Sequence, residues 1–277
     1  MSAKTKALVV LSGGQDSTCC LAIAKLRSEH SEVAAITFDY NQRHRIELDA
    51  ARTVARLMGI TNHSVLAIGP ILQGTSPLTD PGEQLEQYKD FASMEKIIGD
   101  RVEKTFVPMR NSLFLTLAAN RAVCMGATVI YTGVCQADNA NYPDCRATFI
   151  SAQEEAINQA LGFEVLDPRR IRIFTPLMHQ SKADAIRESV RLGYYYFLAY
   201  THTAYDGQYP PIGNDHATVL RAQGFLEADV PDPLVVRAAM EGRMPLPATP
   251  NYRGPLVHKV EKVLERGRLP RVVAEDA

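Results

Sequence analysis

The sequence is poor in cysteine, and the few cysteines present form no recognisable framework. They are odd in number, irregularly spaced and without a CxxC pair: Cys19, Cys20, Cys124, Cys135 and Cys145. Disulfide-stapled secreted domains and cysteine-rich zinc sites use even or clustered sets. The sequence therefore predicts neither a disulfide framework nor a thiolate zinc site.

The chain also has almost no net charge, and it has no long apolar run. The formal net charge is −1 and the pI is near 6.7, so no global basic field holds nucleic acid, and we expect no direct nucleic-acid partner. Because no run of about 18 apolar residues occurs, we expect no transmembrane helix and no membrane partner. The N-terminus, MSAKTKALVV, leads directly into a strand without the apolar region of a secretory signal, which predicts a cytoplasmic protein.

The apolar residues that are present alternate between strand and helix patterns. The chain has 277 residues, of which 46% are hydrophobic, enough for one sizeable core. Short apolar runs predict strands at 7–11, 33–38, 63–68, 128–134 and 171–174. Helical patterns separate these strands: one ends near Arg27, and others cover 45–58, 111–124 and 147–161. Asn111 is the expected cap of the third. A last helix is expected after Ser181, which forms a capping box with Asp184. Alternating strands and helices predict an α/β fold, a doubly wound parallel five-stranded sheet.

Two stretches depart from this alternation. Residues 69–107 form a long polar insertion with one weak helix near 93–98. After Gly193 the pattern weakens, with tyrosines at 194–196 and two further helices at 231–244 and 255–266. We therefore expect a nucleotide-binding α/β domain at residues 1–192 and a small C-terminal helical lobe at residues 193–277.

The first strand is followed by a loop suited to phosphate, Ser12-Gly13-Gly14-Gln15-Asp16-Ser17. Its glycines allow a tight turn and close approach to an anion, and the backbone N–H groups at the start of the helix favour negative charge. The loop is not a Walker A motif, because the Lys-Ser/Thr pair is missing, and it lacks the third glycine of a dinucleotide fingerprint. The alternative is an ordinary strand–helix turn.

The complete loop resembles the signature of the PP-loop ATP pyrophosphatases, which include GMP synthetase, argininosuccinate synthetase and the tRNA-thiolating enzymes. This resemblance implies the fold of the adenine nucleotide alpha hydrolases. It also implies ATP as cofactor, with Mg²⁺, cleavage between the α- and β-phosphates, and transfer of AMP to a substrate oxygen.

Three more segments resemble the QueC family of 7-cyano-7-deazaguanine synthases from queuosine biosynthesis. They are residues 38–44, FDYNQRH; residues 107–111, VPMRN; and residues 132–135, TGVC, with 142–146, YPDCR. The resemblance covers roughly residues 1–225. It implies an ATP-dependent carbon–nitrogen ligase that converts 7-carboxy-7-deazaguanine to the nitrile with ammonia, through an adenylate and an amide. We also expect a homodimer.

The resemblance and the residue chemistry together assign candidate roles. For catalysis the candidates are Ser12, Asp16, Ser17, Arg110 and Lys182. For ATP they are Ser12, Gly13, Gly14, Gln15, Asp16, Ser17, Phe38 and Asp39, the last for magnesium or ribose. For the substrate they are Gln42, Arg43, His44, Tyr142, Asp144 and Arg146. Arginines suit carboxylate and phosphate, Tyr142 can stack on a flat ring, and Asp144 can accept from the N–H groups of a guanine-like base. Each residue alone also fits a solvated loop, a plain turn or a cap.

The family pattern fails at its zinc cysteines. QueC proteins carry four such cysteines, and the matching positions here are Ala204, Ile212, Asp215 and Thr218. Such a set cannot rebuild a closed thiolate site, so we expect no zinc and no metal ligands in the chain. The alternative is a rewired site of His202, Asp206, Asp215 and His216.

Three functions fit the sequence. The first is the QueC-like ligase reaction with ammonia. The second keeps adenylation but conjugates the activated deazaguanine to a protein amine, as relatives of QueC in antiviral defence loci make reasonable. The third is a non-catalytic protein that binds a nucleobase or nucleotide.

Overall fold

The computed structural model of the chain describes residues 4–74, 76–136, 141–267 and 269–270. A five-stranded sheet forms its centre, with all neighbouring strands parallel and the order β3-β2-β1-β4-β5. The strands are β1 (Thr5–Val10), β2 (His30–Asp39), β3 (His63–Ala67), β4 (Val129–Tyr131) and β5 (Arg172–Phe174). The doubly wound α/β fold predicted from the sequence is confirmed.

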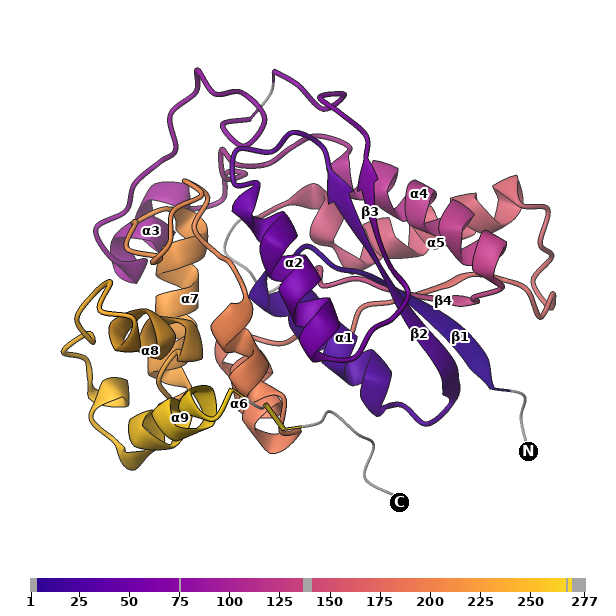
Figure 1. Cartoon of the computed structure of the whole chain (residues 1–277). Helices are drawn as coiled ribbons and strands as arrows, with labels where there is room; N and C mark the ends of the chain where they lie inside the picture. The colour runs from indigo at the N-terminus through magenta and orange to yellow at the C-terminus, as the bar shows by residue number, and fades with distance from the viewer. Residues whose placement is uncertain (1–3, 75, 137–140, 268, 271–277) are drawn as a thin grey trace.

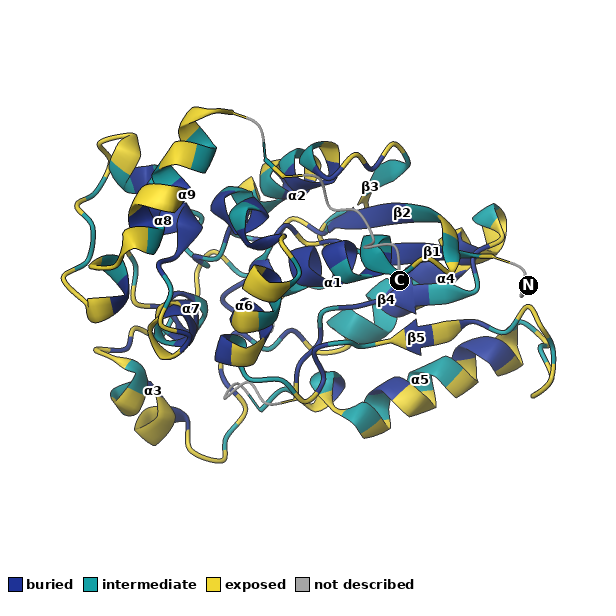
Figure 2. Ribbon diagram, turned by 90° about the horizontal axis from the view of Figure 1, so that it is seen from below, coloured by how far each residue is buried: buried dark blue, intermediate teal, exposed yellow. Residues whose placement is uncertain are grey.

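Helices cover both faces of the sheet (Figure 1). One face carries α1 (Gln15–Leu26), α2 (Ile46–Leu57) and α6 (Lys182–Arg191), and the other carries α4 (Arg110–Met125) and α5 (Ala147–Ala160). Along β1, Ala7 and Val9 join the first core while Leu8 joins the second. A strand buried on both faces needs apolar residues at every position, which explains the continuous run in the sequence. Figure 2 shows the central strands buried between the two layers.

The C-terminal region packs against the first of these cores. It contains the 3₁₀ turns η2 (Tyr195–Tyr200) and η3 (Pro250–Tyr252) and the helices α7 (His216–Glu227), α8 (Pro233–Met240) and α9 (Pro255–Glu265). Phe197, Phe225 and Val236 are buried in the same cluster as Cys19 and Leu21 of α1. Residues before and after position 192 thus contribute to one core. The division into two domains at residue 192 stays a prediction.

The polar insertion contains the predicted weak helix, which is α3 (Phe91–Ile98). Asp90 caps it, because its side chain accepts from Ser93 N and the Ser93 hydroxyl accepts from Asp90 N in return. Met94 and Ile98 pack against Leu220 of α7, and α3 lies beside α7 in Figure 1. The insertion therefore reaches the C-terminal region.

One local expectation was wrong, and one helix was not predicted. Asn111 does not cap α4: the helix begins at Arg110 after Met109, whose φ is 64°, and the Asn111 side chain donates to the Asp144 carbonyl at 3.2 Å. Helix α7 was not predicted, although Asp215 caps it by accepting from Thr218 N at 3.0 Å. The capping box of Ser181 and Asp184 at α6 is confirmed. Within the described residues, no helix is long and apolar enough to span a membrane.

Candidate active site

A cavity of about 470 Å³ opens where the strand order reverses, outside the carboxyl ends of β1 and β4. This crevice is where open α/β sheets bind ligands. Most of the residues predicted from the sequence line it: Ser12, Gly14, Gln15, Asp16, Ser17, Phe38, His44, Arg110, Tyr142, Arg146 and Lys182. The tertiary structure therefore brings together segments from the whole length of the α/β region.

Hydrogen bonds between its two serines hold the phosphate loop in shape. The Ser17 hydroxyl accepts from Ser12 N at 3.2 Å, donates to the Gly14 carbonyl at 3.2 Å and lies 3.0 Å from the Ser12 hydroxyl. No side chain caps α1 at Gly14. The first N–H groups of α1 are thus left to face an anion in the cavity.

Glycine is required at two close approaches around this loop. Gly13 has φ +92°, and a Cβ there would lie 2.3 Å from the Glu47 carbonyl oxygen of α2. A Cβ at Gly133, just after β4, would lie 2.9 Å from Ser17 N. Both distances are shorter than any real contact, so larger residues would push the loop out of place.

Lys182 and Asp16 form an ion pair at the cavity, with Lys182 Nζ 2.5 Å from Asp16 Oδ2. Lys182 is the first residue of α6, whose start is fixed by the capping box of Ser181. Gly224 of α7 lies against it, because a Cβ at Gly224 would be 2.6 Å from Lys182 Cβ. The C-terminal region therefore helps to place a cation beside the phosphate loop.

Arg110 is a half-buried cation that also lines the cavity. Burial by itself lowers its pKa, but the neighbouring Tyr40, Tyr142 and Tyr205 hydroxyls and Asp144 raise the pKa above its ordinary value. Burial raises the pKa of Tyr40 to about 12, so this phenol is neutral. Arg110 is thus a permanent positive charge in a largely uncharged aromatic setting, which suits a carboxylate ligand.

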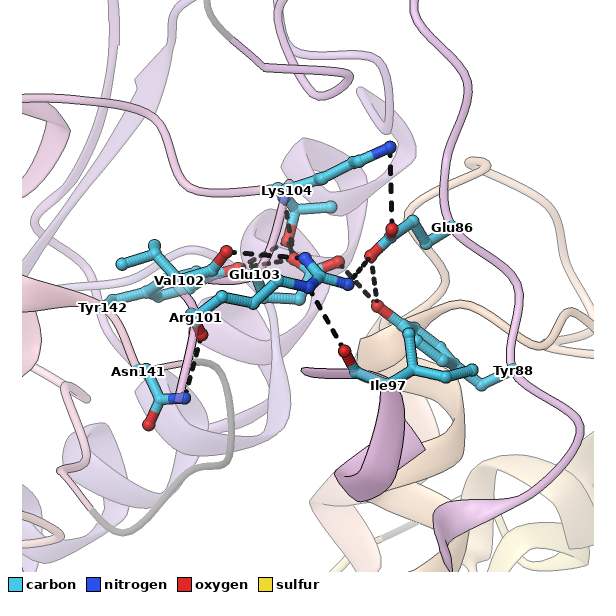
Figure 3. A network of polar contacts seen from close by, with 10 residues as sticks. Glu86, Tyr88, Ile97, Arg101, Val102, Glu103, Lys104, Asn141 and Tyr142 are labelled. Carbon is cyan, nitrogen blue, oxygen red and sulfur yellow. Dashed lines mark hydrogen bonds and ion pairs between the residues drawn. The ribbon is translucent and has the colours of Figure 1, made fainter. Parts of the chain in front are cut away.

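Tyr142 is held by the insertion, as Figure 3 shows. Its hydroxyl donates to Glu103 Oε2 at 3.3 Å, and Glu103 is buried and also accepts from Tyr88 and from Thr105 N. Glu86 extends the network by accepting from Tyr88 and Arg101. The insertion therefore fixes one ring in the wall of the cavity.

Two cavity-lining side chains bury a polar atom without a partner in the described part of the chain. These atoms are Gln15 Nε2 and His44 Nδ1. An unmet buried polar atom costs about 1–3 kcal/mol. Such atoms next to a cavity are consistent with a ligand that completes the site.

The remaining predicted residues lie outside the cavity lining. Asp39 accepts from Arg45 at 2.6 Å, and Arg43 donates to the carbonyls of Pro81 and Glu83 in the insertion. Asp144 accepts from Asn111 N at 3.3 Å and is buried, which raises its pKa.

Gln42 bridges the Phe38 carbonyl and Glu47, and Gly13 lies behind the loop against α2. All of these residues lie next to residues that do line the cavity. Their predicted roles stay predictions.

Sequence reasoning gave no role to several lining residues, among them Glu47, Tyr205 and Arg221, and it considered His202 only as a ligand of a rewired metal site. Glu47 carried a usable signal, because it lies one helical turn after His44 and the two side chains meet at 3.1 Å. Arg221 carried none: its bidentate pairing with Asp232, at 2.6 and 2.8 Å, joins two helices that only the fold brings together.

The positions that match the zinc cysteines of the QueC pattern do not fit zinc. Ala204 and Ile212 have no ligand atoms, and the Asp215 oxygens accept from Tyr205 N at 3.1 Å and from Thr218 N and Oγ1 at 3.0 and 3.1 Å. No group of three or more histidine, cysteine or acidic residues that could hold a metal occurs within the described ranges. Asp215 thus links Tyr205 and Thr218 by hydrogen bonds. In the QueC pattern, cysteines in this segment would be linked through a zinc ion instead.

Comparisons with known proteins identify the family of the chain. The family model described as Queuosine biosynthesis protein QueC matches residues 6–229. A protein of Gloeobacter violaceus named 7-cyano-7-deazaguanine synthase is 49% identical over 232 residues, covering 83% of this chain and 95% of its own.

A protein of the same name from Chromobacterium violaceum is 45% identical over 240 residues, covering 86% of this chain and 96% of its own. Among solved structures, a 4-thiouridine synthetase–RNA complex with bound ATP shares 17% identity at a TM-score of 0.41, covering 77% of this chain and 45% of that one. The family match and the close relatives show that this chain belongs to the QueC family.

Proposed function

We propose that this chain is an ATP-dependent carbon–nitrogen ligase that converts 7-carboxy-7-deazaguanine to 7-cyano-7-deazaguanine with ammonia. One observation carries the proposal: the uncapped start of α1, the Lys182–Asp16 pair and Arg110 all line the same cavity. The names of the close relatives support the choice of substrate.

The first step is adenylation. A carboxylate oxygen of the substrate attacks the α-phosphorus of ATP, the bond to the β-phosphate oxygen breaks, and pyrophosphate leaves. The serine-held loop and Lys182 bind the pyrophosphate and stabilise its growing charge. Mg²⁺ carried by the nucleotide offsets further negative charge.

The second step makes the carbon–nitrogen bond. Ammonia attacks the activated carboxyl carbon, the carbon–oxygen bond to AMP breaks, and AMP leaves with the electron pair to give the amide. A second ATP adenylates the amide oxygen, and loss of AMP with the amide protons gives the nitrile. Arg110 and Tyr142 hold the flat substrate during both rounds, the first by charge and the second by stacking.

The test is to incubate the protein with ATP, Mg²⁺ and 7-carboxy-7-deazaguanine, with and without ammonium, and to measure pyrophosphate and the products by mass spectrometry. We expect ATP–pyrophosphate exchange without ammonium, and the free nitrile over many turnovers with it. Absence of both refutes the ligase and favours a binding protein. Adenylation that proceeds only to a conjugate with an added protein amine favours the second function.

A further inference from the structure

The cavity contains an acidic side chain that neither ATP nor a carboxylate substrate explains. Among the described residues that line it, two are acidic, Asp16 and Glu47. Asp16 is paired with Lys182. The partners of Glu47 are an imidazole and an amide, His44 and Gln42, so no lysine or arginine is bound to it within the contacts of the described chain.

The Glu47 carboxylate is built into position. Gln42 Nε2 donates to Oε1 at 2.7 Å, and His44 Nε2 lies 3.1 Å from Oε2. Because a carboxylate accepts, Nε2 is the nitrogen of His44 that carries the proton. Burial raises the pKa of Glu47, but the neighbouring His44 and His202 and the hydrogen bond from Gln42 together outweigh it and leave the pKa below its ordinary value. Glu47 is therefore ionised at neutral pH.

An ionised carboxylate in this cavity repels the other ligands. ATP and the substrate carboxylate are both anions, and like charges in a partly buried site interact strongly. Glu47 is also close to the phosphate loop, since its backbone oxygen lies against Gly13. A carboxylate kept there suits a ligand that is positively charged.

We propose that Glu47 binds the nitrogen source as ammonium beside the activated carboxyl group. One N–H proton then passes to the Glu47 carboxylate, and the ammonia so formed attacks the carboxyl carbon with its free lone pair. A carboxylate has about four lone-pair positions, and two are used by Gln42 and His44, so it can still accept N–H bonds from ammonium. His44 and Gln42 are positioning residues that aim Glu47. The inference rests on the proposed ligase function.

The main test compares Glu47→Gln with Asp49→Asn. Both changes remove one negative charge from α2, but Asp49 is exposed and lies outside the cavity. The ammonium concentration that gives half-maximal amide formation is measured with ATP and substrate saturating. We expect it to rise about 10- to 100-fold in Glu47→Gln, the cost of losing a charged hydrogen bond, and to stay unchanged in Asp49→Asn.

ATP–pyrophosphate exchange without ammonium separates this inference from the proposed function. We expect exchange in Glu47→Gln not to fall below that of the parent protein, because adenylation needs no amine and the change removes a negative charge that repels ATP. Hydroxylamine, which is uncharged at neutral pH, should trap the adenylate at a nearly unchanged rate. Glu47→Asp keeps the charge on a shorter side chain, so the ammonium concentration for half-maximal amide formation should rise less than in Glu47→Gln. This variant replaces Glu47→Gln in the test if Glu47→Gln does not fold.

An ammonium dependence unchanged in Glu47→Gln overturns the inference. So does a loss of exchange that excess Mg²⁺ restores, because Glu47 would then serve the metal–nucleotide complex. If the parent protein itself shows no exchange, the proposed function fails instead. An equal rise for ammonium and for hydroxylamine also contradicts the charge argument.

Discussion

Replacement of Lys182 by methionine tests the core of the proposed chemistry. Methionine keeps an unbranched side chain that fills the space between α6 and α7, so the change removes chiefly the charge. Lys182 Nζ lies 2.5 Å from Asp16 Oδ2, and its side chain is 13% exposed. The cation is thus largely shielded from water at the mouth of the phosphate loop.

The expected loss follows from Coulomb's law. A unit charge about 4 Å from a phosphate oxygen, at an effective dielectric constant of about 20, contributes about 4 kcal/mol. If the transition state loses this interaction energy and the ground state does not, adenylation slows about 10³-fold. The ion pair itself is partly exposed and contributes about 1 kcal/mol to folding at most. The melting temperature should therefore fall by only about 2–4 °C.

The assay is ATP–pyrophosphate exchange, with thermal unfolding measured on the same sample. The matched control is Lys6→Met, because Lys6 forms a surface pair with Glu32 away from the cavity. We expect the control to exchange at the parent rate. Exchange by Lys182→Met within about tenfold of the parent would refute the assignment of Lys182 to the leaving pyrophosphate.

Five further substitutions and a metal analysis test other parts of the structure. Ser12→Ala and Asp16→Ala should abolish pyrophosphate release while the fold is kept, as circular dichroism would show; normal turnover would mean that the loop is not catalytic. Gly13→Ala should destabilise the protein by about 2 kcal/mol or more and abolish exchange, since its Cβ would meet the backbone of α2 at 2.3 Å. Asp144→Asn should weaken binding of the deazaguanine much more than of ATP in calorimetry, whereas equal losses would indicate a structural role through Asn111. Elemental analysis should find no stoichiometric zinc, chelators should leave the melting temperature unchanged, and Asp215→Ala should cost about 1–3 kcal/mol of stability because three donors lose their acceptor.

The segments that carry local signals were predicted well. The turn between β1 and α1, the strand order along the chain and the Ser181 capping box depend on residues close in sequence, so composition and spacing were enough. Prediction was wrong where a distant partner competes with a local one. Asn111 looks like a cap in the sequence, but the Asp144 carbonyl takes its side-chain donor in the fold. Helix α7 was missed because its segment was compared only with a metal-binding pattern.

The sequence by itself determined the strands, the Gly-rich turn at residues 12–17 and the kinds of charge available, because periodicity and glycine spacing act within a few residues. Only the tertiary structure decided which of those charges meet. Lys182 reaches Asp16 across 166 positions of the chain, and Glu103 of the insertion reaches Tyr142 across 39. It also decided that Glu47 lies in the cavity while Asp39 and Arg43 do not. Side-chain direction at such sites depends on packing between distant segments, and no local pattern in the sequence records that packing.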